Sequence, residues 1–157
     1  MAYADWTYFH SLYSGVAEAD YNRRAWDASQ LMDYHTTGVD GVAKLRKHLP
    51  TDEYDLEAVK RCCCALIDLM VKVDAAEAAS GLVARADGTV SGKIVSSVSS
   101  GSESISYSTA AVTAFDKAVA DRSARDTLYS DIVRHYLSGV HDSNGVNLLY
   151  MGAYPDV

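Results

Sequence analysis

The sequence predicts a mainly α-helical protein: a small helical bundle with one long central helix, a serine-rich β-hairpin or extended loop between helices, and an extended C-terminal tail. Three observations predict this fold. Apolar residues recur at spacings of three and four along most of the chain, which is typical of amphipathic helices. Serine fills nine of the 18 positions from Ser91 to Ser108, a composition that does not favour a helix. An apolar cluster follows the last helical pattern, near the C-terminus.

The chain of 157 residues is long enough for one compact domain with a hydrophobic core of its own. We therefore expect a single domain over residues 1–157. Its expected parts are a helical body over about 5–81 and 109–138, a hairpin or loop over about 91–108, and a C-terminal docking tail over about 140–157.

Two helices are expected in the N-terminal part. The first runs from about Asp5, as N-cap, to Tyr13, and the second from about Glu18 to Thr36, where Gly38 can close it at the C′ position. Eight of the 15 aromatic residues lie within the first 34 residues. Because aromatic side chains contribute much of the apolar surface that cores bury, we expect this end of the chain to be packed.

The long helix is expected after Pro50, with Thr51 as its N-cap and Ala79 near its end. At a rise of about 1.5 Å per residue it would be roughly 40 Å long. A helical turn or two is expected before it, around Val42 to His48. The three cysteines, 62–64, are consecutive on the long helix, where successive side chains point about 100° apart. We expect reduced, partly buried thiols rather than a disulfide framework or a metal site.

The serine-rich segment reads as two short strands, Ile94 to Val98 and Glu103 to Tyr107, because apolar residues alternate with serine. A flexible linker is the alternative, since serine-rich tracts are commonly linkers. Helical pattern returns around Val112 to Val119 and again after Ser123, which with Asp126 forms a capping-box-like start.

Composition and motifs narrow the function classes. The chain carries 21 acidic and 14 basic residues, for a net charge of -7, which disfavours tight DNA binding through phosphate neutralisation. The most apolar run contains Asp68 and Lys72, so neither a membrane span nor a signal peptide is expected. The sequence holds no HExxH, phosphate-binding glycine loop or GxSxG. We expect no catalytic residue, no cofactor and no metal, and therefore not an enzyme.

Short motifs along nearly the whole chain, taken in order, form a recognisable set: Tyr13-Ser14-Gly15, Asp20-Tyr21, Ala28-Ser29, Met32-Asp33-Tyr34, Thr36-Thr37, Val59-Lys60-Arg61-Cys62-Cys63-Cys64-Ala65-Leu66, Val95-Ser96-Ser97-Val98, Ser104-Ile105-Ser106-Tyr107, Ile132-Val133-Arg134-His135-Tyr136-Leu137 and Leu148-Leu149-Tyr150-Met151-Gly152. With this ordered set the chain resembles the head-tail connector, or head-completion adaptor, proteins of tailed bacteriophages, of the type found in HK97-like and SPP1-like siphophages.

The resemblance implies a virion protein at the head-tail interface, present in the host cytoplasm during assembly. It would form a homo-oligomeric ring of about twelve copies under the portal protein and extend the DNA channel. Its further partner would be a neck, stopper or tail-completion protein. DNA would pass through the channel without specific binding, and the acidic net charge fits that role because few phosphates would be neutralised.

Two segments are the expected partner-binding elements, since an apolar cluster on a short tail needs a surface to cover it. The expected partner-binding residues are Leu148, Leu149, Tyr150, Met151 and Gly152 in the tail, and Val95, Val98, Ile105 and Tyr107 in the serine-rich segment. Two alternatives stay open: a tail-completion or stopper neck protein, and a small cytosolic helical binding or regulatory domain. A connector should form or join a high-order ring, whereas a regulator should act as a monomer or dimer.

Overall fold

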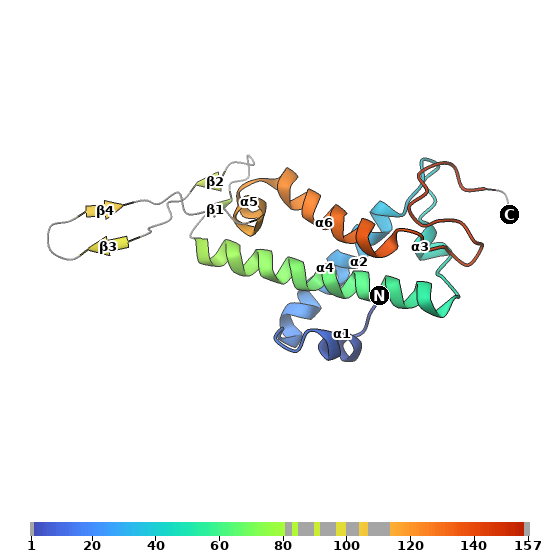
Figure 1. Cartoon of the computed structure of the whole chain (residues 1–157), viewed down its shortest axis with the longest axis horizontal. Coiled ribbons are helices and arrows are strands. Elements are labelled where there is room, and N and C mark those ends of the chain that lie inside the picture. The colour runs from blue at the N-terminus through green and yellow to red at the C-terminus, as the bar shows by residue number, and fades with distance from the viewer. Residues whose placement is uncertain are drawn as a thin grey trace. The chain divides into compact units, whose positions relative to one another are not determined.

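The computed structural model describes residues 2–80, 83–84, 90–91, 97–99, 104–106 and 114–155, and the side chains of 2–78 and 117–155. These residues are mainly helical (Figure 1). The elements in chain order are α1 (Trp6–Leu12), α2 (Glu18–His35), α3 (Lys44–Lys47), α4 (Glu53–Ser80), β1 (Val83–Ala84), β2 (Val90–Ser91), β3 (Ser97–Ser99), β4 (Ser104–Ser106), α5 (Ala114–Ala120) and α6 (Arg122–Leu137). The predicted small helical bundle is confirmed.

The helix starts depend on aspartate caps. Asp5 caps α1 as predicted, because its Oδ1 accepts a hydrogen bond from the Tyr8 amide at 2.8 Å. Asp52, and not the predicted Thr51, caps α4: its Oδ1 accepts from the amides of Tyr54 and Asp55 at 2.9 and 3.1 Å. These amides have no partner within the first turn of a helix, so a carboxylate there satisfies two of them at once.

The start of α6 also differs from the prediction, because its N-cap lies two residues before the predicted Ser123. The Asp121 carboxylate accepts from the Ser123 amide at 2.9 Å, so Asp121 takes the capping role that the sequence assigns to Ser123. At the end of α2, Gly38 does not take the C′ position that the sequence predicts for it. The C-cap of α2 is Thr36, and the described glycines with positive φ are Gly41, Gly139 and Gly145, but not Gly38.

The chain divides into two compact units, residues 1–71 with 129–157, and residues 72–128. Helices α4 and α6 each contribute to both units. The expectation of a single domain stays a prediction.

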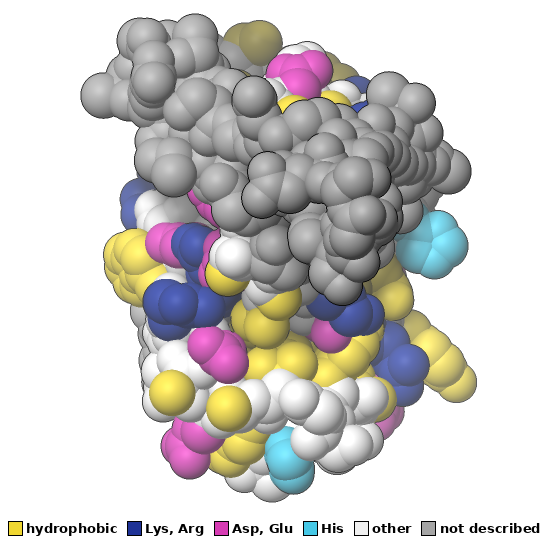
Figure 2. Space-filling view, turned by 90° about the vertical axis from the view of Figure 1, so that its left-hand side faces the viewer, with side chains coloured by type: hydrophobic (Ala, Val, Ile, Leu, Met, Phe, Trp, Pro, Cys, Tyr) yellow, Lys and Arg dark blue, Asp and Glu magenta, His cyan; other side chains and the backbone are white. Residues whose placement is uncertain are grey.

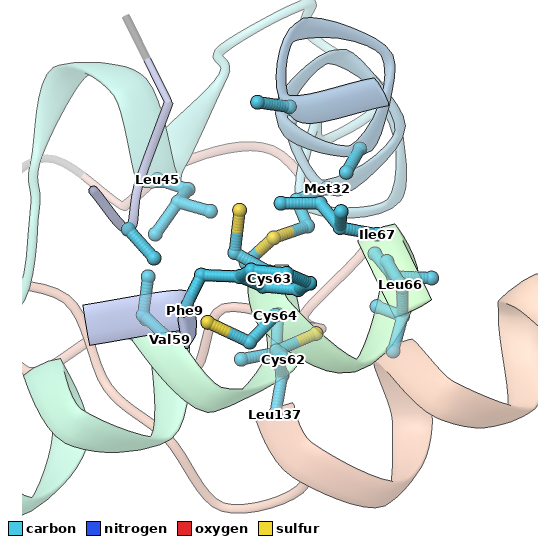
Figure 3. Close-up of a cluster of buried hydrophobic side chains, with 14 of the residues drawn as sticks. Phe9, Met32, Leu45, Val59, Cys62, Cys63, Cys64, Leu66, Ile67 and Leu137 are labelled. Atoms are coloured by element: carbon cyan, nitrogen blue, oxygen red, sulfur yellow. The ribbon is translucent and has the colours of Figure 1, made fainter. Parts of the chain in front are cut away.

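The first unit has a hydrophobic core around the first half of α4 (Figure 3). The side chains of Cys62, Cys63 and Cys64 are all fully buried there, although they point about 100° apart. A helix that buries every side at one turn is enclosed by its neighbours, and this makes α4 the central helix that the sequence predicts. The buried residues that close the core come from the other elements: Phe9, Met32, Leu45, Leu137 and Leu148.

Burial also determines the chemistry of the three thiols. It raises the pKa of all three, that of Cys64 to about 12. Because the thiolate is the reactive form of cysteine, such thiols are inert packing groups at neutral pH. They are more completely buried than the sequence indicates.

In the second unit, Val73, Ala118 and Val119 are buried. Arg125 donates through Nε to the Ala118 carbonyl at 2.9 Å, and its guanidinium lies 3.8 Å from Glu77. Strands β1 and β2 pair antiparallel, and so do β3 and β4, with Val98 opposite Ile105. Of the two alternatives for the serine-rich segment, a hairpin and a flexible linker, the pairing of β3 with β4 corresponds to the hairpin. Of the helices that the structure describes, none combines the length and the hydropathy that crossing a membrane requires.

Candidate interaction surface

The C-terminal segment, residues 138–155, contains neither helix nor extended strand, and its first part turns the chain back toward the core. Gly139, at φ +83°, ends α6 in the left-handed conformation that glycine adopts without strain. The amide of Asp142 then bonds to the Val146 carbonyl at 2.9 Å, and the amide of Leu148 to the Val140 carbonyl at 2.9 Å. This small loop brings the Leu148 side chain into the core, where it is 0% exposed.

Asp142 organises the loop from within. It is buried, and its Oδ1 accepts from the amides of Asn144 and Val146, both at 2.9 Å. Its Oδ2 accepts from the hydroxyl of Tyr154 at 2.6 Å. The Tyr154 ring stacks on His48 with centroids 4.8 Å apart. Burial and the bond to Asp142 together raise the pKa of Tyr154, so this phenol stays a neutral donor.

Backbone contacts also hold the part of the C-terminal segment that lies between Leu148 and Tyr154. The Val39 amide donates to the Met151 carbonyl at 3.0 Å, and the Tyr154 amide donates to Asp40 Oδ2 at 2.6 Å. Lys44, only 1% exposed, donates through Nζ to the Tyr150 carbonyl at 2.5 Å. Burial lowers the pKa of this lysine. These contacts use main-chain atoms of Tyr150 and Met151, so the side chains of both residues stay available.

Two glycines, Gly38 and Gly152, lie where the C-terminal segment crosses close to the chain that follows α2. A Cβ on Gly38 would lie 2.6 Å from the Gly152 carbonyl oxygen, and a Cβ on Gly152 would lie 2.2 Å from the hydroxyl of Tyr150. Both distances are far below van der Waals contact. Gly38 therefore serves the approach of the C-terminal segment rather than the end of α2, and Gly152 leaves room for the ring of Tyr150.

A groove of about 600 Å³ lies beside this crossing. We call it the aromatic groove, and it is lined by Tyr34, His35, Thr37, Gly38, Val133, Arg134, Leu149 and Met151. Its rim is apolar and open, because Tyr34 is 74% exposed and Met151 is 52% exposed. Tyr150, next to Met151, is about half exposed.

A second hollow of about 240 Å³, the Trp26 hollow, lies along α2, and the buried α2 residues Ser29 and Asp33 form part of its lining. It is lined by Tyr3, Trp26, Ser29, Gln30, Asp33, Leu45, Arg46 and Leu49. Trp26 and Leu49 are exposed at its edge. Inside it, the Tyr3 hydroxyl donates to the Asp33 carboxylate, and burial together with that bond raises the pKa of Tyr3.

Each hollow has an arginine on its wall, Arg134 in one and Arg46 in the other. Neither guanidinium forms an ion pair with any residue whose side chain the structure describes. By contrast, Arg23, Arg24 and Arg61 are paired with acidic neighbours on their own helices. Figure 2 shows hydrophobic side chains exposed between charged side chains of both signs on the face it presents.

The residues that the sequence assigns to partner binding have different positions. Leu148 is a core residue, so it cannot touch a partner in this conformation; its apolar contacts are with the chain's own core. Leu149 is partly buried and lines the aromatic groove, whereas Tyr150 and Met151 are exposed.

Of the four expected residues of the serine-rich segment, the two that the structure describes, Val98 and Ile105, belong to the other unit. Val98 and Ile105 are cross-strand partners of β3 and β4, and Val95 and Tyr107 lie outside the described residues.

Sequence reasoning missed Trp26, Tyr34, Arg46 and Arg134 as surface candidates. A signal for two of them is present, because Trp26 and Tyr34 are large aromatics that fall off the apolar stripe of α2, which contains Tyr21, Ala25, Ala28 and Met32. No comparable signal distinguishes the two arginines. Their significance depends on which carboxylates lie nearby in the folded chain.

Among the residues that the structure describes, no group of three or more histidine, cysteine, aspartate or glutamate side chains is arranged to hold a metal ion. Comparison of the chain with models of known protein families, with curated proteins and with solved structures gives no significant match.

Proposed function

We propose that the protein is a structural and interaction protein of a phage particle, a head-tail connector whose ring lies under the portal, extends the DNA channel and joins the head to the neck and tail. The observation that supports an interaction role most strongly is the aromatic groove: exposed Tyr34 and Met151 lie beside an arginine without an ionic partner among the described residues. The ordered resemblance of the sequence motifs supplies the connector part of the proposal.

The chemistry of the groove is that of a protein interface. Tyrosine, tryptophan, methionine and arginine are enriched in the buried centre of interfaces, and tyrosine, tryptophan and arginine supply most hot spots. An exposed apolar patch is costly in water unless something covers it. Tyr150 and Met151 therefore serve as contact residues, and Leu148 anchors them from inside the core.

A connector ring needs two different patches on each subunit, because head-to-tail contacts close a ring only when the patches differ. The chain offers more than one exposed apolar region, since the aromatic groove and the Trp26 hollow share no lining residue. The net charge of -7 favours a channel through which DNA slides, because phosphates are repelled rather than neutralised.

The double variant Tyr150→Ser/Met151→Ser tests the contact role. Both residues hold the fold through main-chain carbonyls, so helix content and melting temperature are expected to stay unchanged. Attachment of the protein to portal-bearing heads that lack it should be lost, because two contact side chains are removed.

Leu12→Ser is the matched control, because Leu12 is an exposed apolar residue of α1 that lines neither hollow. The control should attach as the wild type does. Normal attachment of the double variant, with its fold intact, would contradict the assignment of these two residues.

A further inference from the structure

We infer that the aromatic groove of one copy receives Tyr54 and Glu53 of a second copy, so that these two residues and the groove form the head-to-tail contact between neighbouring subunits. The inference rests on the proposed ring. The copies meet through this surface, and the charges of Glu53 and Arg134 set the register of the contact.

Tyr54 is the most exposed large hydrophobic residue of the described chain, at 87%. It projects from the first turn of α4, where the Asp52 carboxylate holds its amide at 2.9 Å. The cap fixes the backbone at the start of the helix, so presenting the ring there costs little backbone entropy on binding. A tyrosine with its hydroxyl in water and its ring uncovered is a typical hot-spot anchor.

Of the carboxylates around Tyr54, Glu53 has no partner among the described residues. Asp52 is engaged by two amides, Asp55 accepts from the His141 amide at 3.0 Å, and Glu57 accepts from Tyr8 and Arg61. Glu53 has no ion pair or hydrogen bond of this kind. It is therefore the carboxylate free to pair with a cation of another molecule.

The aromatic groove has the complementary properties. Its apolar walls, Tyr34, Leu149 and Met151, can stack on and enclose a tyrosine ring, and its volume of about 600 Å³ exceeds that of one side chain. Its cation, Arg134, has no ionic partner among the described residues. An unpaired arginine in one patch and an unpaired glutamate in another indicate electrostatic complementarity, which fixes register and excludes wrong partners.

The two patches share no residue, so a contact between them is heterologous. Such a contact adds subunits in one direction and closes into a ring or continues as a filament, whereas a self-complementary patch would stop at a dimer. This is why the inference predicts assembly beyond a dimer.

Substitutions that reverse the charges of Arg134 and Glu53 test the inference. Self-association of the purified full-length chain is measured by sedimentation and native mass spectrometry at concentrations up to millimolar. Arg134→Glu and Glu53→Arg are each expected to weaken association at least about 10-fold, and Tyr54→Ala by about 30-fold. The double variant Glu53→Arg/Arg134→Glu should return to within about 3-fold of wild type, because the pair is restored with its signs exchanged.

Lys47→Glu is the control, since Lys47 is an exposed lysine of α3 that lines neither hollow and has no ionic partner among the described residues. It should associate as the wild type does. A wild type that stays monomeric, that stops at a dimer, or whose association is unaffected by these substitutions would overturn the inference.

The virion supplies an independent readout of the proposed function. If the protein is a neck component but the variants assemble normally, the inference fails alone. If association follows the charge exchange but the protein is absent from virions, the connector function fails alone.

Discussion

Tyr154 links the C-terminal segment to the body of the first unit through one side chain and its own amide. Its hydroxyl donates to Asp142 and accepts from the Asn144 side-chain amide, its ring stacks on His48, and its amide donates to Asp40. Because Tyr150 and Met151 lie between this residue and the buried Leu148, their positions depend on Tyr154.

Tyr154→Phe should lower the free energy of unfolding by about 1–2 kcal/mol. The substitution keeps the stacked ring but removes a hydrogen bond to a buried carboxylate, and bonds to charged groups are the stronger ones. Urea denaturation followed by circular dichroism measures the change.

Tyr150→Phe serves as the comparison, because no hydrogen bond is found for the Tyr150 hydroxyl among the described residues. It should shift stability by less than about 0.5 kcal/mol. Equal effects of the two substitutions would show that the bond to Asp142 does not hold the segment.

The exposure of single side chains in the C-terminal segment could not be predicted from the sequence. The run from Leu148 to Met151 is apolar throughout, and outside a helix or strand no periodicity tells which side chain points inward. The sequence therefore indicates an apolar docking segment but not that Leu148 enters the core while Met151 stays exposed. It could not be predicted that Arg134 has no ionic partner among the described residues, since this depends on neighbours distant in sequence.

At the level of single elements, the helices follow from local patterns and their ends do not. The spacing of apolar residues predicts α2, α4 and α6, and the structure has helices in all three places. The caps of α4 and α6 differ from prediction by one and two residues. Thr51 and Asp52 are both good N-cap residues, so only the path of the chain leaving Pro50 decides between them.

Asp52→Ala should destabilise the protein by about 1 kcal/mol, because two first-turn amides of α4 lose their acceptor. Thermal or chemical denaturation measures the change in unfolding free energy.

Thr51→Ala is the matched control, and it should change stability by less than about 0.5 kcal/mol. A larger loss for Thr51→Ala than for Asp52→Ala would mean that the helix starts one residue earlier, as the sequence predicts.

At the level of the whole chain, two long helices serve both compact units, and the first unit carries the candidate interaction surface. The helical class follows from the sequence because periodicity over many residues averages out local ambiguity. The surface does not, because it is assembled from the end of α2, the second half of α6 and the C-terminal segment. Only folding brings these parts together.

Quantitative mass spectrometry of purified virions of the phage that produces this protein tests the connector function most directly. We expect a copy number equal to that of the portal protein, or in the fixed ratio that a ring docked on the portal requires. Absence of the protein from infectious tailed particles would contradict the connector function and favour a small helical binding domain of the host cytosol.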